Sequence, residues 1–117
     1  MAIQNLFVVG AGLMGSGIAQ NAITSGYTVT LNDQRQEALD RAKAGIEQAL
    51  DRDVSKGRMA AEDRDAALAR LSLNPSMEGA KNADLVIEAI YENLEAKQAV
   101  FTALEEICPE NTIFASN

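Results

Sequence analysis

The sequence predicts an α/β domain built on a doubly wound parallel sheet. Short apolar runs typical of buried strands alternate with stretches whose apolar residues recur at the three- and four-residue spacing of amphipathic helices. A glycine-rich turn separates the first apolar run from the first helical stretch. Parallel strands joined through helices favour right-handed crossovers, and they bring the carboxyl ends of the strands to one edge of the sheet.

The amino-terminal third of the chain contains a complete strand–turn–helix–strand unit. The apolar run 3–9 leads into the glycine motif 10–15, a helical stretch follows, and a second strand-like run, 27–32, leads directly to Asp33. A lone G-x-G-x-x-G motif is weak evidence, but here both strands, the helix and the terminal acid lie in register. This order predicts a dinucleotide-binding site of the Rossmann type.

Each glycine of the turn has a physical role. Gly10 permits backbone dihedrals that a side chain would oppose, Gly12 lets a pyrophosphate approach the main chain, and Gly15 lets the helix pack closely on the sheet. The first amides of the helix lack intrahelical partners and lie at the positive end of its dipole, so they attract the pyrophosphate. We therefore expect the cofactor to be bound by the turn residues Gly10, Ala11, Gly12, Leu13, Met14 and Gly15.

Asp33 is the second part of the predicted cofactor site. It follows Gly10 by 23 residues and stands at the end of the second predicted strand, where a carboxylate can accept hydrogen bonds from an adenosine ribose. The same negative charge would repel a 2′-phosphate, so the sequence favours NAD over NADP. Arg35, two residues later, could in principle soften this preference.

After the second strand the sequence predicts a long helical hairpin. A first helix is expected over 34–55, with its apolar positions at Ala38, Leu39, Ala42, Ile46, Ala49 and Leu50. Lys56-Gly57 is a natural stop, and a second helix is expected over 60–71. This hairpin is much longer than a plain crossover requires, so we expect it to do more than cover the sheet.

The rest of the chain continues the alternation of strands and helices. A short strand over 71–73 and a small helix or turn over 77–81 precede the run 84–89. The continuous apolar centre of that run is typical of a parallel strand buried on both faces. A helix over 93–107 and a buried-strand run over 112–115 complete the pattern.

Length, charge and composition exclude several classes of function. With 117 residues the chain is a single domain, 1–117, and because domains seldom stop at the carboxyl end of an inner strand we expect it to be truncated. The formal charge of −7 argues against binding to nucleic-acid phosphates. A single cysteine, with no apolar stretch long enough to span a bilayer, predicts a cytoplasmic protein with no membrane partner. The chain has no histidine, the commonest acid–base group and metal ligand, so we expect no metal site and no complete catalytic machinery.

Several motifs occur in order along the whole chain: the glycine segment 10–20, Asp33, the strand 84–89, Glu92-Asn93-Leu94 with Lys97, and the closing run 113–117. Their combination resembles the amino-terminal domain of L-3-hydroxyacyl-CoA dehydrogenases, including 3-hydroxybutyryl-CoA dehydrogenases. The resemblance implies an enzyme that transfers hydride between the 3-hydroxyl of an acyl-CoA and NAD. It also implies that NAD contacts the glycine turn and Asp33, together with Glu92 and Lys97.

The resemblance has further implications for the substrate and for the rest of the enzyme. The helical hairpin contacts CoA in this family, and Lys56 is the candidate here for a CoA phosphate, while Ala49 replaces a serine that takes part in some members. The family's catalytic residues are expected beyond Asn117, so no residue of this chain is assigned to catalysis. A helical carboxyl-terminal domain, absent from this chain, is expected to close the cleft and to form a homodimer.

Two alternatives remain open at this point. One is a relative that acts on a hydroxy acid without CoA, such as an L-gulonate 3-dehydrogenase. The other is an NAD-binding structural or sensing protein without turnover, a role for which lens crystallins of this fold provide a precedent.

Overall fold

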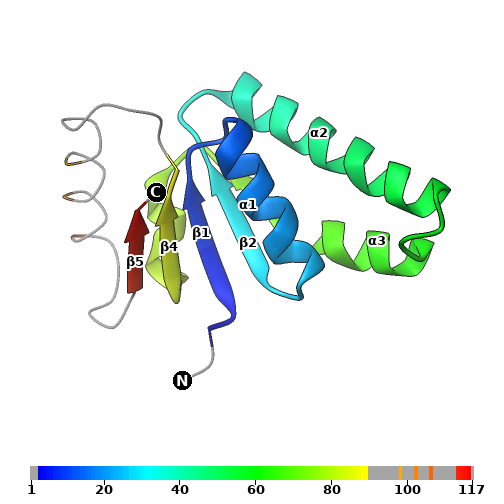
Figure 1. Cartoon of the computed structure of the whole chain (residues 1–117). Helices are drawn as coiled ribbons and strands as arrows, with labels where there is room; N and C mark the ends of the chain where they lie inside the picture. The colour runs from blue at the N-terminus through cyan, green and yellow to red at the C-terminus, as the bar shows by residue number, and fades with distance from the viewer. Residues whose placement is uncertain (1–2, 90–97, 99–101, 103–105, 107–112, 117) are drawn as a thin grey trace.

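The computed structural model describes residues 3–89, 98, 102, 106 and 113–116. The strands are β1 (Asn5–Val9), β2 (Thr28–Asn32), β3 (Leu71–Asn74), β4 (Leu85–Glu88) and β5 (Ile113–Ser116). The helices are α1 (Leu13–Thr24), α2 (Gln36–Ser55) and α3 (Ala61–Ala69), with the 3₁₀ helix η1 (Met77–Asn82). All strand pairs are parallel, in the order β3-β2-β1-β4-β5 (Figure 1). The predicted doubly wound sheet of the Rossmann type is therefore confirmed.

The strand order creates a topological switch point beside β1. The chain builds the sheet outward through β2 and β3 and then returns to the other side of β1 with β4. In this sheet Val9 is in register with Asn32 on one side and with Glu88 on the other. The residues that follow these three strand ends therefore share one edge of the sheet. Open parallel sheets bind ligands at such a point, outside the carboxyl ends of the strands.

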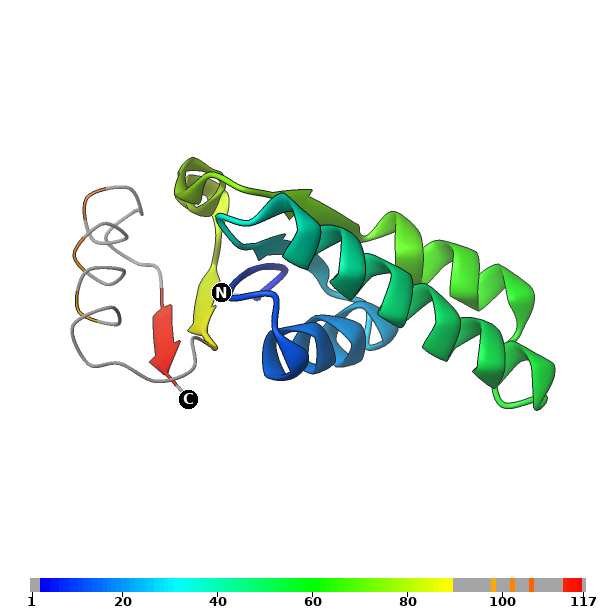
Figure 2. The same ribbon diagram turned by 90° about the horizontal axis from the view of Figure 1, so that it is seen from above.

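The alternation of side chains along β1 divides the core between the two faces of the sheet. Leu6 and Val8 belong to the larger apolar cluster, which also contains buried residues of α1, α2 and α3. Phe7 and Val9 belong to a smaller cluster with residues of the η1 segment. Figure 2 shows α1 and η1 on opposite sides of the sheet. Both faces of β1 are covered, and accordingly its residues 6–9 are all apolar and buried, as is typical of a central parallel strand.

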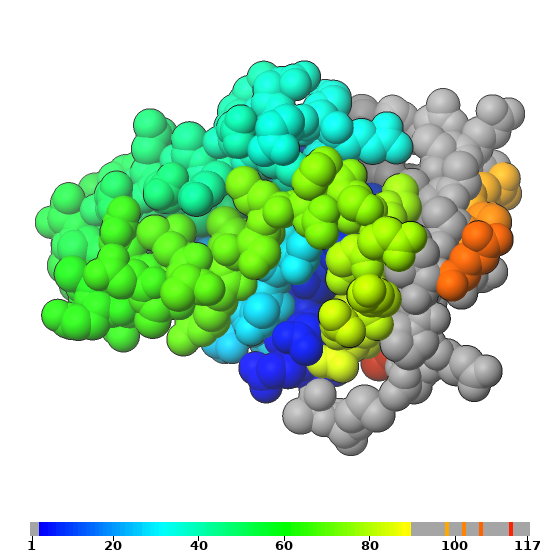
Figure 3. Space-filling model, turned by 180° about the vertical axis from the view of Figure 1, so that it is seen from behind, coloured from blue at the N-terminus to red at the C-terminus, as the bar shows by residue number. Residues whose placement is uncertain are grey.

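The segment from α3 through β3 to η1 is seen on the face of the molecule that is turned away from the viewer in Figure 1 (Figure 3). Seen from behind, residues of the blue first strand lie between this segment and the yellow β4 segment (Figure 3). A Cβ on Gly79 of η1 would lie 3.2 Å from a ring carbon of Phe7 and 2.7 Å from the side-chain nitrogen Nδ2 of Asn74. A glycine at this position thus allows η1 to lie close against β1.

The helical hairpin is confirmed, with boundaries that differ slightly from the expected ones. The first helix begins at Gln36 and not at residue 34, because Arg35 is its N-cap and has an extended backbone. The second helix ends at Ala69, since Leu71 already pairs with β2 as the first residue of β3. Gly57, with a φ of +74°, makes the turn between the two helices.

Two other predictions compare with the structure as follows. The strand expected over 84–89 is present as β4, but only Val86 and Glu88 are buried within it, while Leu85 and Ile87 are partly exposed. Leu85 and Ile87 pack against the larger apolar cluster, so one face of β4 is fully buried and the other is partly buried. The helix expected over 93–107 lies largely outside the described residues.

Candidate functional site

The glycine turn connects β1 to α1 through a conformation that its sequence makes possible. Gly10 has a φ of +106°, in the left-handed region that side chains disfavour, and its amide donates to the Asn32 carbonyl at 2.7 Å. A Cβ on Gly15 would lie only 1.7 Å from the carbonyl oxygen of Gly10. A glycine is thus required at position 15 because the helix touches the backbone of the turn itself. The sequence predicts a contact between the helix and the sheet, whereas the contact found here is with a residue only five positions earlier.

The amino terminus of α1 is left open toward solvent. Gly12 is the N-cap, no side chain caps this terminus, and the first turn of α1 contains no acidic residue. A Cβ on Gly12 would meet nothing within 4 Å among the described atoms. Ser16 donates its hydroxyl back to the Gly12 carbonyl at 2.8 Å and so holds the turn against the helix. This arrangement leaves amide donors, the positive helix end and free space together, as an anionic ligand requires.

Asp33 lies at the end of β2 with four hydrogen bonds to its carboxylate. Its Oδ2 accepts from the Ala11 amide at 3.0 Å and from the NH2 group of Arg35 at 3.2 Å. Its Oδ1 accepts from the Arg35 amide at 3.0 Å and from Nε of Arg35 at 3.1 Å. Partial burial raises the pKa of Asp33, but these hydrogen bonds and the Arg35 charge outweigh it and hold the pKa below its ordinary value. Asp33 is therefore a carboxylate at neutral pH.

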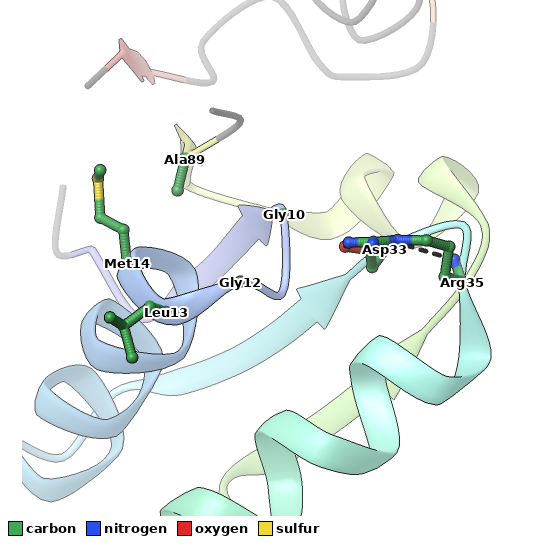
Figure 4. A pocket seen from close by; sticks show the side chains of 7 residues that line it. All are labelled: Gly10, Gly12, Leu13, Met14, Asp33, Arg35 and Ala89. Carbon is green, nitrogen blue, oxygen red and sulfur yellow. Dashed lines mark hydrogen bonds and ion pairs between the residues drawn. The ribbon is translucent and has the colours of Figure 1, made fainter. Parts of the chain in front are cut away.

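A cavity of about 570 Å³ joins these features at the carboxyl edge of the sheet. The described residues that line it are Gly10, Gly12, Leu13, Met14, Asp33, Arg35 and Ala89. In Figure 4 the charged pair Asp33 and Arg35 lies at one end, Met14 and Ala89 lie at the other, and the glycine turn lies between them. The cavity thus has a polar end beside β2, amide donors in its middle and an apolar end beside β4.

The structure brings together most of the residues predicted for the cofactor site. Ala11 is buried and does not line the cavity, but its amide fixes the Asp33 carboxylate; Gly15 is buried against Gly10. Lys56 does not join this group, because it is exposed at the far end of α2, where its amide donates to Arg52. Glu92 and Lys97 lie outside the described residues, as does Cys108.

Two cavity-lining residues were not assigned to the site from sequence. The sequence indicates Arg35 only as a modifier of the cofactor preference. Its position two residues after Asp33 allows both a backbone and a side-chain contact with the same carboxylate. Ala89 follows β4 directly, and its amide donates to Val9 at 2.9 Å. Its only sequence signal is a small residue at the end of the predicted strand beside the switch point.

A second groove of about 440 Å³ lies between α1 and α2, on the other side of the turn. Gly12 and Leu13 line both the cavity and this groove, so the glycine turn lies between the two. Leu13 is 95% exposed at this position. Arg41 is the charged residue among those described along this groove.

Comparison with known proteins decides the family. A family model described as "3-hydroxyacyl-CoA dehydrogenase, NAD binding domain" matches residues 5–117. The chain belongs to this family. The open α1 terminus, the space at Gly12 and the ionised Asp33 fit the phosphates and the ribose of NAD, the cofactor of such a domain. The nicotinamide ring would supply the hydride chemistry when bound, and the domain supplies binding and orientation.

The relatives of this NAD-binding domain are longer enzymes. A probable 3-hydroxybutyryl-CoA dehydrogenase of Bacillus subtilis is 42% identical over 117 residues, which cover all of this chain and 41% of the relative. A 3-hydroxyadipyl-CoA dehydrogenase of Escherichia coli K12 is also 42% identical, over 98% of this chain and 24% of that protein. The crystal structure of a 3-hydroxybutyryl-CoA dehydrogenase from E. coli K12 superimposes with a TM-score of 0.97 at 41% identity, over 100% of this chain and 25% of that one.

The chain thus spans about two fifths or less of the length of these relatives. Two of them are equally identical to this domain, yet their names contain different acyl groups. Similarity over this domain therefore does not determine the acyl group. Among the described residues no helix is long and apolar enough to cross a membrane, and no group of three or more acidic, histidine or cysteine side chains could hold a metal ion.

Proposed function

We propose that this domain holds NAD for an L-3-hydroxyacyl-CoA dehydrogenase, in which hydride passes between the 3-hydroxyl of an acyl-CoA and the nicotinamide. The observation that carries the proposal is the single cavity that contains the glycine turn, the open α1 terminus and Asp33. The names of the relatives support the acyl-CoA substrate, since they are 3-hydroxybutyryl-CoA and 3-hydroxyadipyl-CoA dehydrogenases.

Each wall of the cavity has a proposed role in binding. The glycine turn, from Gly10 to Gly15, receives the pyrophosphate at the open amino terminus of α1, through the helix dipole and the amides of the helix start. The amides of Gly10 and Ala11 instead hold the turn in place, because they donate to Asn32 and Asp33. Asp33 accepts hydrogen bonds from the adenosine ribose. The apolar end beside Met14 and Ala89 receives the nicotinamide half. Glu92 and Lys97 are proposed as further cofactor contacts on the family resemblance alone.

The helical hairpin is proposed to bind the CoA part of the substrate. The α1–α2 groove is lined by residues of both helices and contains Arg41, a cation suited to a phosphate. Lys56 is proposed as a second phosphate contact at the far end of α2. The two residues are 15 positions apart on or next to one helix, or about 22 Å at 1.5 Å per residue. An extended ligand with phosphates is compatible with that separation.

Three features of the whole protein belong to the same proposal. Catalytic residues are supplied from outside this chain, so the chain alone binds NAD without turnover. A helical carboxyl-terminal domain forms the homodimer contact. The protein is cytoplasmic, and its net charge of −7 disfavours nucleic-acid partners.

Asp33→Ala tests the cofactor site. Isothermal titration calorimetry with NAD⁺ and NADP⁺ should show weaker NAD binding by the variant and a smaller difference between the two nucleotides. The loss should be about tenfold or more, because charge-assisted hydrogen bonds to the ribose are removed. Binding of NAD⁺ and NADP⁺ with the wild-type ratio would contradict the role of Asp33.

Lys56→Glu tests the substrate site. The variant should weaken binding of 3-hydroxybutyryl-CoA and leave NAD binding unchanged. Lys81→Glu is the matched control, since Lys81 is an exposed lysine of η1, which lies on the side of the sheet opposite α1. Equal losses in both variants would indicate a general charge effect. No affinity for acyl-CoA, with normal affinity for NAD, would instead favour a hydroxy-acid substrate or a non-catalytic role.

A further inference from the structure

The carboxylate of Asp33 has no acceptor position left for a ligand in this conformation. An ionised carboxylate offers about four lone-pair sites. Four donors occupy them: the amides of Ala11 and Arg35, and the Nε and NH2 groups of the Arg35 guanidinium. A ribose presents hydroxyl groups that must donate to this carboxylate. It can do so only after one of the four donors has left.

The donor that can leave is the Arg35 side chain. The two amides belong to the backbone of the turn and of the α2 N-cap, and their positions are fixed by the fold. The Arg35 side chain is 63% exposed, whereas that of Asp33 is 11% exposed. The guanidinium therefore closes the Asp33 carboxylate from the solvent side, at the polar end of the cavity (Figure 4). An exposed ion pair of this kind opens at small cost.

We propose that Arg35 sets the selectivity of this site between NAD and NADP, by competing with the ribose of NAD for Asp33 and by offering a cation to the 2′-phosphate of NADP. The proposal rests on the placement of the adenosine ribose at Asp33. NAD must open the Arg35–Asp33 pair before its ribose can bind. NADP carries a phosphate in place of the 2′-hydroxyl, so it gains from the guanidinium instead of displacing it.

The charge balance of the cavity supports this assignment. Among its described lining residues, Asp33 and Arg35 are the two that carry a charge. The bare Asp33 carboxylate would repel a 2′-phosphate, but the guanidinium beside it cancels that repulsion. A planar guanidinium is also the group best suited to bind a phosphate through two hydrogen bonds. The structure therefore predicts measurable affinity for both nucleotides, with the preference for NAD reduced by Arg35.

The test measures the dissociation constants of NAD⁺ and NADP⁺ by calorimetry for the wild-type chain and for Arg35→Ala. The variant should bind NADP⁺ more weakly and NAD⁺ equally or more tightly, so the ratio of the two constants should shift toward NAD by about tenfold. Arg52→Ala is the matched control. It removes the same charge from the other end of α2, away from the cavity, and should leave the ratio within about twofold of wild type.

Two further variants distinguish charge from structural damage. Arg35→Gln should shift the ratio in the same direction as Arg35→Ala, and it serves as the test if the alanine variant does not fold. Arg35→Lys keeps the cation and should restore most of the affinity for NADP⁺. Raising the salt concentration should weaken NADP⁺ binding more steeply in the wild-type chain than in Arg35→Ala, because only the wild type has the cation.

The outcomes separate this proposal from the cofactor site itself. A ratio unchanged in Arg35→Ala and Arg35→Gln, with normal NAD⁺ binding, would overturn the role of Arg35 and leave Asp33 in place. Wild-type chain that binds NAD⁺ but shows no detectable NADP⁺ binding would overturn it as well. Folded wild-type chain that binds neither nucleotide would overturn both the Arg35 proposal and the site on which it rests.

Discussion

Gly15→Ala should disable the cofactor site through a single added methyl group. The new Cβ would lie 1.7 Å from the carbonyl oxygen of Gly10, and real Cβ atoms essentially never come closer than 3.0 Å to such a neighbour. The two atoms must therefore separate by about 1.3 Å. The neighbour is a backbone carbonyl. Its peptide plane is held by the hydrogen bond that the Ala11 amide donates to Asp33, so it cannot rotate away as a side chain would.

The expected cost falls on both stability and binding. Overpacking of this kind costs about 1–3 kcal/mol of the free energy of unfolding. A displacement of about 1 Å in the turn that we propose receives the pyrophosphate should weaken NAD binding by roughly a hundredfold. Urea denaturation measures the first effect, and calorimetry with NAD⁺ measures the second.

Gly17→Ala is the matched control two residues along the same helix. A Cβ on Gly17 would meet nothing within 4 Å, so the substitution adds no clash. Alanine is favoured over glycine inside a helix by about 0.5–1 kcal/mol, so this variant should be slightly more stable than wild type. If Gly15→Ala bound NAD⁺ as well as Gly17→Ala and unfolded at the same urea concentration, the close contact with Gly10 would be refuted.

Three further predictions concern the core and the dependence on pH. Leu50→Ala, at a fully buried position of α2, should lower the free energy of unfolding by about 2–5 kcal/mol, whereas Leu13→Ala, at a 95% exposed position, should change it by less than about 0.5 kcal/mol. Urea titrations of both variants check this pair, and equal losses would contradict the burial assignment. Hydrogen bonds from the Asn5 and Gln4 amides hold the pKa of Asp84 below its ordinary value of 3.8. The Asp84 carboxylate therefore contributes its full stabilisation above pH 3.8, and this contribution is lost as the pH falls through the lower pKa of the folded state. Asp84→Asn should therefore reduce the loss of thermal stability in acid, and an unaltered acid profile would argue against these hydrogen bonds. The pKa of Asp33 is lowered too, so NAD⁺ affinity should stay constant between pH 6 and 8, and a change in calorimetric affinity across that range would show that another group titrates in the site.

The cofactor site could be predicted in outline because its parts are encoded locally. Gly10, Gly12 and Asp33 each follow a strand end, and the rules of parallel sheets place such positions at one edge. In the structure Val9 is in register with Asn32 and Glu88, so the residues that follow these three strand ends do lie at the same edge of the sheet. The family resemblance added the substrate class, which no feature of the cavity reveals alone.

Other features depended on contacts between distant or freely rotating groups. The helix start moved to Gln36 because Arg35 has an extended backbone and donates its amide to Asp33. Lys56 is separated from the cofactor cavity because α2 begins beside Asp33 and continues for 20 residues before it ends at Lys56, its C-cap.

The sequence by itself determined the doubly wound parallel sheet, the glycine turn and an acid at the end of the second strand, since periodicity and chirality leave few other ways to pack these segments. Only the tertiary structure decided that Gly15 touches the carbonyl of Gly10 and that Arg35 closes over Asp33. Both depend on distances of a few ångströms between groups whose separation along the chain does not fix their separation in space. The path of the backbone can be inferred from the pattern of apolar residues and glycines. Which donors occupy the lone pairs of the Asp33 carboxylate can be known only from the positions of the side chains.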